Sequence, residues 1–260
     1  MALLATALLV AAPAVAQVPE LTPLNYALRY DVAWSNIPIG RIRMTIKEDT
    51  FRYEISLDIK TRGIVRMFDS TVSTITATGH FKPEGMARAN RYQSVSTDDD
   101  SSKVTTVTYA EDGTIEHRER KPADDPNNRP PVPLHQANEA QDPLTAMYAL
   151  RHTMRKHMVR NERTTTARTY DGARLADFTF KVISPATMEI MGEHIRAINT
   201  VLKREPIAGY KQKELKKFKE GDPTIHVYFS ADSKLLPVKA DIKLRFGTIS
   251  ATLTDLQPIQ

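Results

Sequence analysis

The feature that most constrains the fold is an alternation of apolar and polar side chains with a period of two residues. It runs through residues 42–47 and returns through residues 53–60. Successive side chains of a β-strand point to opposite faces of the sheet, so this pattern is typical of strands with one buried face. The polar link at residues 48–50 predicts that the two segments form a hairpin.

Turn residues divide much of the remaining chain into further strands. Asp112-Gly113 and Asp171-Gly172 each lie between two strand-like segments, and Asp-Gly suits the positive φ angles of tight hairpin turns. The segments beside these turns are 103–110, 114–120, 164–170 and 174–183, and further strands are expected at 70–78, 224–230, 236–244 and 248–256. Because most connections are short, we expect sequence neighbours to pair in an antiparallel sheet.

One helix is expected among these strands. Asp142 suits the N-cap, and Pro143 suits the first turn, where its missing N–H would have no helical partner. The helix should end near Met158, with Arg151, Arg155 and Lys156 away from a side that carries Leu144, Met147, Tyr148, Met154 and Met158. This pattern predicts an amphipathic helix packed on the sheet.

The segment before the helix, residues 121–141, contains five prolines. Proline removes a backbone donor, so the segment is expected to be a loop. About 20 residues is long for a loop in a compact domain, which leaves two interpretations, a functional flap or a disordered stretch.

The N-terminus resembles a secretory signal. Residues 1–16 contain no charge and are largely apolar, and Ala14-Val15-Ala16 fits an A-x-A cleavage site. We therefore expect residues 1–16 to be a signal peptide and residues 17–260 to form a single β-rich domain in the periplasm. No Lys or Arg precedes the apolar run, so the true start codon stays open. The run is much shorter than the roughly 20 residues that span a bilayer.

Nothing in the sequence indicates an enzyme. The chain has no Cys, which excludes thiol catalysis, Cys-ligated zinc and iron–sulfur clusters. It also lacks the phosphate-binding loop, the dinucleotide fingerprint, the nucleophile elbow, the H-E-x-x-H zinc motif and the EF-hand loop. We expect no catalytic residue, no metal and no cofactor, and the sequence does not identify the residues of a ligand site.

Two groups of residues have the side-chain types of metal ligands. His152 and His157 are five residues apart on the expected helix, whereas ligands on one helical face are three or four apart. The acidic run at residues 98–100 is followed by Ser101-Ser102, without the glycine and the later Glu of a calcium loop. The acidic run is therefore interpreted as a solvated hairpin tip.

The net charge of +5 includes a basic cluster. The cluster contains Tyr210, Phe218, Lys211, Lys213, Lys216, Lys217 and Lys219. The favoured interpretation is a charged strand edge that prevents edge-to-edge aggregation, and the alternative is peripheral contact with anionic lipid in a membrane. Export makes nucleic acid an unexpected partner.

Aromatic residues are expected mainly in the core. They are Trp34, Phe51, Tyr53, Phe68, Tyr92, Tyr109, Phe178, Phe180, Tyr228, Phe229 and Phe246. Trp34, the single Trp of the chain, should anchor the sheet, and Gly40 should permit a tight turn between the first two strands. The sequence leaves open whether the interior of the sheet is packed or holds a ligand.

Several segments, taken in order, resemble the family called domain of unknown function 3108. They are residues 30–34, 37–40, 62–65 with Phe68, 142–151, 170–172, 236–238 and 247–249. The resemblance implies an exported protein of Gram-negative bacteria, mainly β, with a strongly curved antiparallel sheet or open β barrel around one central amphipathic helix. That architecture is similar to the periplasmic lipoprotein carriers, which hold acyl chains in an open barrel. The family provides no catalytic residue to carry over.

Three functions are compatible with these observations. The first is a non-enzymatic periplasmic protein that binds an apolar or lipid ligand in the curved sheet, with lipid or a lipoprotein as its partner. The second is a structural or interaction protein of the cell envelope that contacts envelope proteins and has no small ligand. The third is a hydrolase of envelope material, which only the expected location supports.

Overall fold

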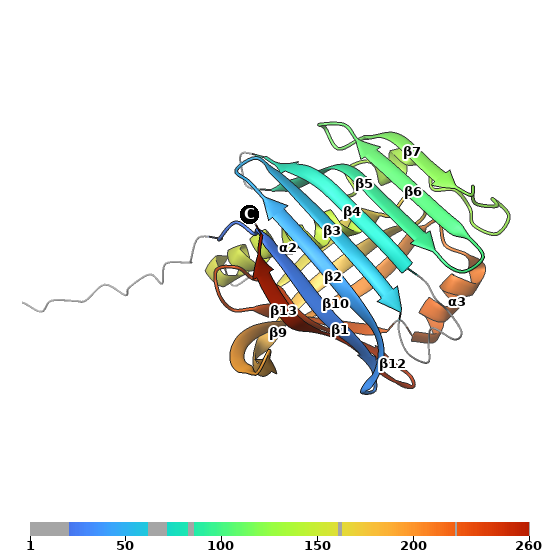
Figure 1. Ribbon diagram of the computed structural model, residues 1–260. Helices are drawn as coiled ribbons and strands as arrows, with labels where there is room; N and C mark the ends of the chain where they lie inside the picture. Colours follow the sequence, from blue (N-terminus) through green and yellow to red (C-terminus); the bar gives the residue numbers. More distant parts are fainter. Residues whose placement is uncertain (1–20, 62–71, 83–85, 161–162, 222, 260) are drawn as a thin grey trace, which may run out of the picture.

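The computed structural model describes residues 21–61, 72–82, 86–160, 163–221 and 223–259, without the side chains of residues 156–160. Within these residues, one antiparallel sheet of 13 strands curves around a helix (Figure 1). The strand order is β7-β6-β5-β4-β3-β2-β1-β13-β12-β11-β10-β9-β8. Neighbouring strands are therefore consecutive in the chain, except where β1 pairs with β13. The expected class, a mainly β open sheet with a central helix, is confirmed.

Seven strands precede the central helix: β1 (Tyr26–Trp34), β2 (Ile37–Glu48), β3 (Arg52–Thr61), β4 (Val72–Phe81), β5 (Ala87–Thr97), β6 (Ser102–Tyr109) and β7 (Ile115–Lys121). Six follow it: β8 (Thr164–Tyr170), β9 (Leu175–Ile190), β10 (Glu193–Ala208), β11 (Thr224–Ser230), β12 (Pro237–Leu244) and β13 (Gly247–Pro258). The helices are α1 (Leu134–Ala137), α2 (Pro143–Arg160) and α3 (Gln212–Gly221).

The predicted hairpins are confirmed. The strands on both sides of residues 48–50, Asp112-Gly113 and Asp171-Gly172 pair as expected. Gly113 and Gly172 have φ angles of +89° and +84°, the conformation for which glycine is favoured. At the acidic tip between β5 and β6, the Asp98 carboxylate accepts the Ser101 amide at 2.7 Å. Among the described residues, no group of three or more His, Cys, Asp or Glu could hold a metal.

Two expectations about the first hairpin are wrong. Ser35 and Asn36 make the β1–β2 turn, with φ angles of 46° and 73°. Gly40 lies inside β2, where a Cβ would stand 2.9 Å from the carbonyl oxygen of Lys60 in β3. The glycine therefore permits the close approach of β2 and β3, and it does not form a turn. Trp34 does not anchor the core, because it stands beside the turn with 42% of its surface exposed.

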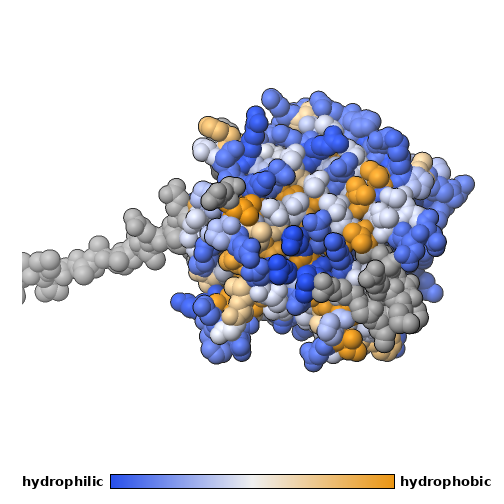
Figure 2. All heavy atoms as spheres, viewed as in Figure 1, coloured by the Kyte–Doolittle hydropathy of each residue, from blue (hydrophilic) through white to orange (hydrophobic). Residues whose placement is uncertain are grey.

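Two more aromatic residues differ from the expected core placement. Phe51 and Phe246 lie in turns and are 72% and 76% exposed, respectively. Each occupies a connection between strands, where a side chain has no second layer above it. Phe68 lies outside the described residues, as do the expected signal peptide and residues 62–65. The outer face of the sheet is mostly hydrophilic, with scattered apolar patches (Figure 2).

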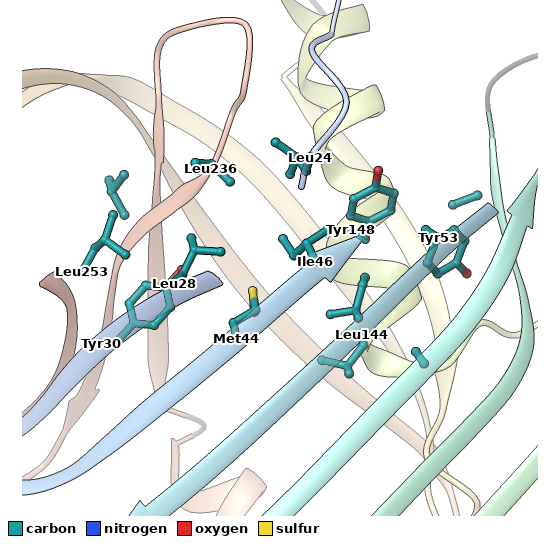
Figure 3. Close-up of a cluster of buried hydrophobic side chains, with 14 of the residues drawn as sticks. Leu24, Leu28, Tyr30, Met44, Ile46, Tyr53, Leu144, Tyr148, Leu236 and Leu253 are labelled. Carbon is teal, nitrogen blue, oxygen red and sulfur yellow. The ribbon is translucent and has the colours of Figure 1, made fainter. Parts of the chain in front are cut away.

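The main core forms where α2 packs against the inner face of the sheet. Leu144 and Tyr148 of the helix point toward Tyr53, Ile46 and Met44 of the strands (Figure 3). The rings of Tyr53 and Tyr148 stack with centroids 5.2 Å apart. A helix is needed here because the inner face of so many strands cannot be buried by the sheet alone.

Asp142 caps α2 as predicted, and it is more deeply buried than the sequence indicated. One carboxylate oxygen accepts the amides of Leu144 and Thr145 at 2.9 Å each, and the other accepts the Thr145 hydroxyl at 2.5 Å. The Tyr53 hydroxyl lies 2.7 Å from the Thr145 hydroxyl. The cap therefore also joins the start of α2 to β3.

Arg151 is buried, although its position in the sequence suggested the polar side of α2. It is 2% exposed, and its guanidinium pairs with the Glu48 carboxylate at 3.2 Å. It also donates to the carbonyl oxygens of Lys234 and Thr22 at 2.8 Å each. A buried guanidinium is stable only with such partners, so this one side chain connects α2 to three separate segments.

The two edges of the sheet are joined by contacts other than a strand ladder. Arg118 of β7 donates from Nε to the carbonyl oxygen of Gly172 at 2.7 Å. A Cβ on Gly172 would lie only 2.3 Å from Thr105 Cγ2 of β6. Gln141 pairs with Thr169 of β8 in an isolated bridge. The tip of the β8–β9 hairpin therefore closes the gap between β6–β7 and β8.

The proline-rich segment is ordered and packed rather than disordered. Val132, Ala137 and Ala140 are buried, and residues 134–137 form the short helix α1. The segment covers the same gap between the sheet edges. Its last residue, Gln141, accepts a hydrogen bond from the Ala89 amide of β5 at 3.1 Å and bridges to Thr169 of β8 on the other side.

The basic cluster is not a strand edge, so that interpretation is wrong. Its lysines belong largely to α3, which has no fully buried residue. The Lys211 amide donates to the Glu214 carboxylate at 2.7 Å, which is one half of a capping box. Lys is not among the residues favoured at an N-cap, so the sequence does not carry the usual signal for this helix start.

The closure of the sheet predicts a difference between two glycines. Gly172→Ala should lower the free energy of unfolding by about 2 kcal/mol more than Gly192→Ala, because only Gly172 packs tightly against β6. Gly192 is a matched control, since its φ of +78° is similar and nothing lies within 4 Å of its Cβ position. Urea denaturation measures both, and equal losses would contradict this role of Gly172.

The buried Asp142 carboxyl predicts an unusual pH dependence. Burial raises its pKa from 3.8 to about 6, so the folded protein holds the proton more tightly than the unfolded chain. The contribution of this carboxyl to the free energy of unfolding is fully present below about pH 4. It falls by about 3 kcal/mol as the pH rises through about 6. Asp142→Asn should therefore gain stability relative to the wild type between about pH 4 and about pH 7.

Chemical denaturation across this pH range measures the difference between the two proteins. Asp142→Ala serves as a comparison, because it also loses the cap and should be about 1 kcal/mol or more below Asp142→Asn. Parallel pH profiles for the wild type and Asp142→Asn would show that the carboxyl has an ordinary pKa.

Candidate ligand-binding groove

An apolar row crosses the inner face of the sheet, from β9 to β1. Its members are directly opposite one another on successive strands: Phe180, Leu202, Ile225, Ile242, Ile249 and Trp34. Opposite residues in an antiparallel sheet share a face. That face is the one that carries α2, because Phe180 packs with Leu150 and Met154 of the helix.

Burial decreases along this apolar row. Phe180 is 8% exposed and Trp34 is 42% exposed, and the four aliphatic residues between them are half-buried. The described residues therefore cover the start of the row beneath α2 and leave its other end accessible. Apolar surface that is accessible on a concave face is the usual lining of a small-molecule site.

A groove of about 400 Å³ continues the row, between α3 and the ends of β10 and β12. Leu244 and Arg204 follow Ile242 and Leu202 by two residues, so they point to the same face of the sheet. The groove is lined by Arg174, Arg204, Tyr210, Glu214, Lys217, Phe218, Glu220, Gly221, Pro223, Leu244 and Arg245. We call this space the α3 groove.

The wall of the α3 groove is aromatic on the helix side. The rings of Tyr210 and Phe218 meet edge to face, with centroids 5.4 Å apart. The guanidinium carbon of Arg204 lies 4.4 Å from the centre of the Phe218 ring, within the range of a cation–π interaction. Desolvation raises the pKa of the Tyr210 hydroxyl above its usual 10.0, so this hydroxyl stays protonated and polar but uncharged.

Basic groups exceed acidic groups around the α3 groove. Four basic side chains line it, and the acidic ones are Glu214 and Glu220. Burial opposes the ionisation of Glu214, but the Lys211 amide and the Arg129 guanidinium outweigh it and lower the pKa of that carboxyl. Glu214 is therefore a charged partner of Arg129. The remaining excess positive charge favours an anionic group at the groove.

The proline-rich segment holds α3 in place through Arg129. Its guanidinium donates to the Gly209 carbonyl oxygen at 2.5 Å and to the Glu214 carboxylate at 3.1 Å. Arg129 also lies near Asp124, which Arg118 and Arg120 contact as well. The arginine side chains at this point bind protein groups and fix the position of the groove wall.

A second depression, of about 570 Å³, lies beside the β2–β3 turn. It is larger than the α3 groove but more polar, with Lys47, Glu48, Asp49 and Arg52 among its residues. Its innermost charged group, Glu48, already accepts the Leu24 amide at 2.7 Å and pairs with Arg151. The α3 groove, which continues an apolar surface, is the better candidate for an organic ligand.

The chain belongs to the family described as protein of unknown function (DUF3108), whose model matches residues 29–254. This match confirms the family that the sequence resembles. No curated protein matches the chain. Among the described residues, no helix is long and apolar enough to cross a membrane.

Solved structures similar to this chain include the following two. One is a β-barrel-like protein of domain of unknown function DUF1849 from Brucella abortus, with a TM-score of 0.53 and 11% identity over 93% of this chain and 100% of that chain. The other is described as a "putative lipoprotein" from Parabacteroides distasonis, with a TM-score of 0.34 and 8% identity over 92% of this chain and 98% of that chain. The first likeness supports the β-barrel-like fold and carries no information on ligands.

The sequence did not identify these groove residues. Phe218, Tyr210 and Lys217 were recognised as a basic and aromatic cluster, but their position against β10 and β12 was not. Arg204 and Leu244 had no distinguishing local pattern. The available signal was the spacing of Leu202 and Arg204. Residues two apart in a strand point to the same face of the sheet, so an inward Leu202 places Arg204 on the inner face as well.

Arg129 predicts a stability test of the groove wall. Arg129→Met should lower the free energy of unfolding by about 3 kcal/mol, because the half-buried Glu214 carboxylate loses its nearer guanidinium and keeps only that of Arg174, at 3.8 Å. The Gly209 carbonyl oxygen also loses its donor. The matched control is Arg168→Met, whose pair with Asp177 is at the surface, with 49% of the Arg168 side chain exposed. That change should cost about 1 kcal/mol or less. Thermal unfolding compares the two, and equal losses would contradict the role of Arg129.

Proposed function

We propose that this protein is a non-enzymatic carrier of the cell envelope that binds an amphiphile with an acyl chain and an anionic head group. The observation that carries the proposal is the apolar row, which runs from the packed core at Phe180 to the exposed Trp34 and passes beside the α3 groove. An acyl chain is an extended apolar ligand, and it would cover the half-buried side chains between Phe180 and Trp34. Covering these side chains would favour binding by about 25 cal/mol for each Å² of apolar surface removed from water.

The charges around the α3 groove determine the kind of head group. Arg204, Lys217 and Arg245 stand on the same groove as the apolar side chains of Phe218 and Leu244. Guanidinium groups form strong charge-assisted hydrogen bonds with carboxylates and phosphates. A fatty acid or a phospholipid combines an acyl chain with such a group, whereas a neutral hydrocarbon has no group to interact with these charges.

The periplasm is the proposed location. It rests on the apolar run and the A-x-A site within residues 1–16, features of a secretory signal. The absence of Cys, which requires a fold without disulfides, is compatible with the large core around α2. Binding without catalysis agrees with the lack of any known catalytic motif in the sequence.

The first experiment is organic extraction of the full chain, purified without detergent, followed by mass spectrometry of the extract. A carrier is expected to release about one lipid per protein molecule. A blank extract, together with no uptake of added fatty acid, would overturn the proposal. That result would favour the alternative function, a structural or interaction protein of the envelope with no small ligand.

Leu244 provides a direct test of the α3 groove. Leu244→Glu should weaken the binding of a dansyl-labelled fatty acid about tenfold or more, because it places an anion beside the head-group site and removes apolar surface. The fluorescence of the dansyl group on titration measures the affinity. Leu244 is 41% exposed, so the fold should tolerate the change.

The matched control is Leu134→Glu in α1, where the leucine is 42% exposed and lies outside the α3 groove. Its affinity for the same probe should remain that of the wild type. Equal weakening in both variants would show that the probe binds elsewhere or responds only to net charge.

A further inference from the structure

The β1–β2 and β12–β13 turns lie side by side at one end of the sheet (Figure 1). The Ser35 amide donates to the carbonyl oxygen of Thr248 at 2.9 Å. The Trp34 indole donates to the carbonyl oxygen of Phe246 at 3.1 Å. The two turns therefore form one continuous surface, and we call its exposed side chains the apolar tip.

The apolar tip exposes large side chains that soluble proteins usually bury. Its members are Trp34, Ile37, Leu244 and Phe246, with exposed fractions of 42%, 56%, 41% and 76%. Single exposed apolar residues are ordinary, but several that adjoin one another mark an interaction surface. Exposing this much apolar surface to water is unfavourable, which is a reason to expect a partner that covers these side chains.

The backbone holds the apolar tip in this conformation. Gly247 has a φ of +113°, and a Cβ at this position would lie 2.3 Å from Ser35 Oγ and 2.8 Å from Trp34 Nε1. Only glycine allows the two turns to approach this closely. The exposure of Phe246, the residue before Gly247, therefore results from a defined turn.

Basic residues lie beside the apolar tip. The guanidinium carbon of Arg245 lies 5.3 Å from the centre of the Phe246 ring. Lys243, near the end of β12, is exposed. α3 adjoins the tip, because Lys217 and Phe218 line one groove together with Leu244 and Arg245. Further exposed lysines of α3 are Lys213, Lys216 and Lys219.

We infer that the apolar tip and the lysines of α3 form a docking surface for an anionic lipid bilayer. Trp and Phe side chains are favoured at the boundary between head groups and acyl chains. Lys and Arg near such a surface contribute roughly 1 kcal/mol each with anionic lipid. Exposed aromatic residues that lie beside basic ones fit a membrane surface, because the aromatic rings can enter the boundary with the acyl chains while the basic groups contact the anionic head groups.

The inference deepens the proposed function, because Leu244 and Arg245 belong to both the docking surface and the α3 groove. A bilayer bound at the apolar tip would meet the accessible end of the apolar row at Trp34. An acyl chain could then pass between the bilayer and the sheet without crossing bulk water. Docking itself does not require the groove to be occupied, so the two ideas can be tested separately.

The single Trp of the chain reports docking directly. Vesicles of mixed phosphatidylglycerol and phosphatidylcholine should shift the Trp34 emission to shorter wavelength, and lipids brominated on their acyl chains should quench it. Vesicles of phosphatidylcholine alone, or added salt, should reduce the response because the lysine contribution is screened or lost. No shift with anionic vesicles and no co-sedimentation would overturn the inference.

Phe246→Glu should lower co-sedimentation with the anionic vesicles about tenfold. The matched control is Phe51→Glu, because Phe51 is 72% exposed in the β2–β3 turn at the other end of β2. Its vesicle binding should equal that of the wild type. Equal losses in the two variants would show that vesicle binding follows net charge and not the apolar tip.

The dansyl-labelled fatty acid separates this inference from the proposed function. Phe246→Gln should lower vesicle binding as well but keep the wild-type affinity for this probe, since Phe246 does not line the α3 groove and Gln adds no charge beside Arg245. Loss of vesicle binding with an intact probe site supports docking as a separate step. Saturable binding of a soluble envelope protein to the apolar tip, with no vesicle binding, would overturn the bilayer as its partner.

Discussion

The position of α2 against the inner face of the sheet is the arrangement on which the rest of the structure depends. Two polar side chains fix it. Asp142 joins the first turn of the helix to Tyr53 of β3 through Thr145, and Arg151 joins its middle to Glu48 and to two backbone carbonyl groups. Removing either side chain would leave buried partners unsatisfied, which costs more than the loss of apolar contact alone.

The helix also determines where apolar surface is left over. It covers the inner face near Phe180 and leaves the apolar row progressively less buried toward Trp34. A sheet of 13 strands has more inner surface than one helix can cover. The uncovered part meets the α3 groove and then the apolar tip, so the candidate ligand site and the candidate membrane surface adjoin each other as consequences of one packing arrangement.

Local patterns in the sequence were sufficient for most of the fold. Alternation with a period of two identified most of the strands, Asp-Gly marked two hairpins, and Asp142-Pro143 marked the start of α2. These signals act between residues that are close in the chain, which is why they can be read without a structure. The same patterns indicated an antiparallel order and, through the family resemblance, a curved sheet around a central helix.

Contacts between distant segments decided the rest. Trp34 and Phe246 look like core residues in the sequence, and they are exposed because they stand at turns beyond the reach of α2. Arg151 looks like a surface residue of the helix, and it is buried because Glu48 approaches it from β2. The sequence by itself determined most of the strands, the central helix and the class of fold, whereas β5 and β10 were not predicted. Only the tertiary structure decided which apolar side chains stay accessible, because burial depends on what the curvature of the sheet brings opposite each residue.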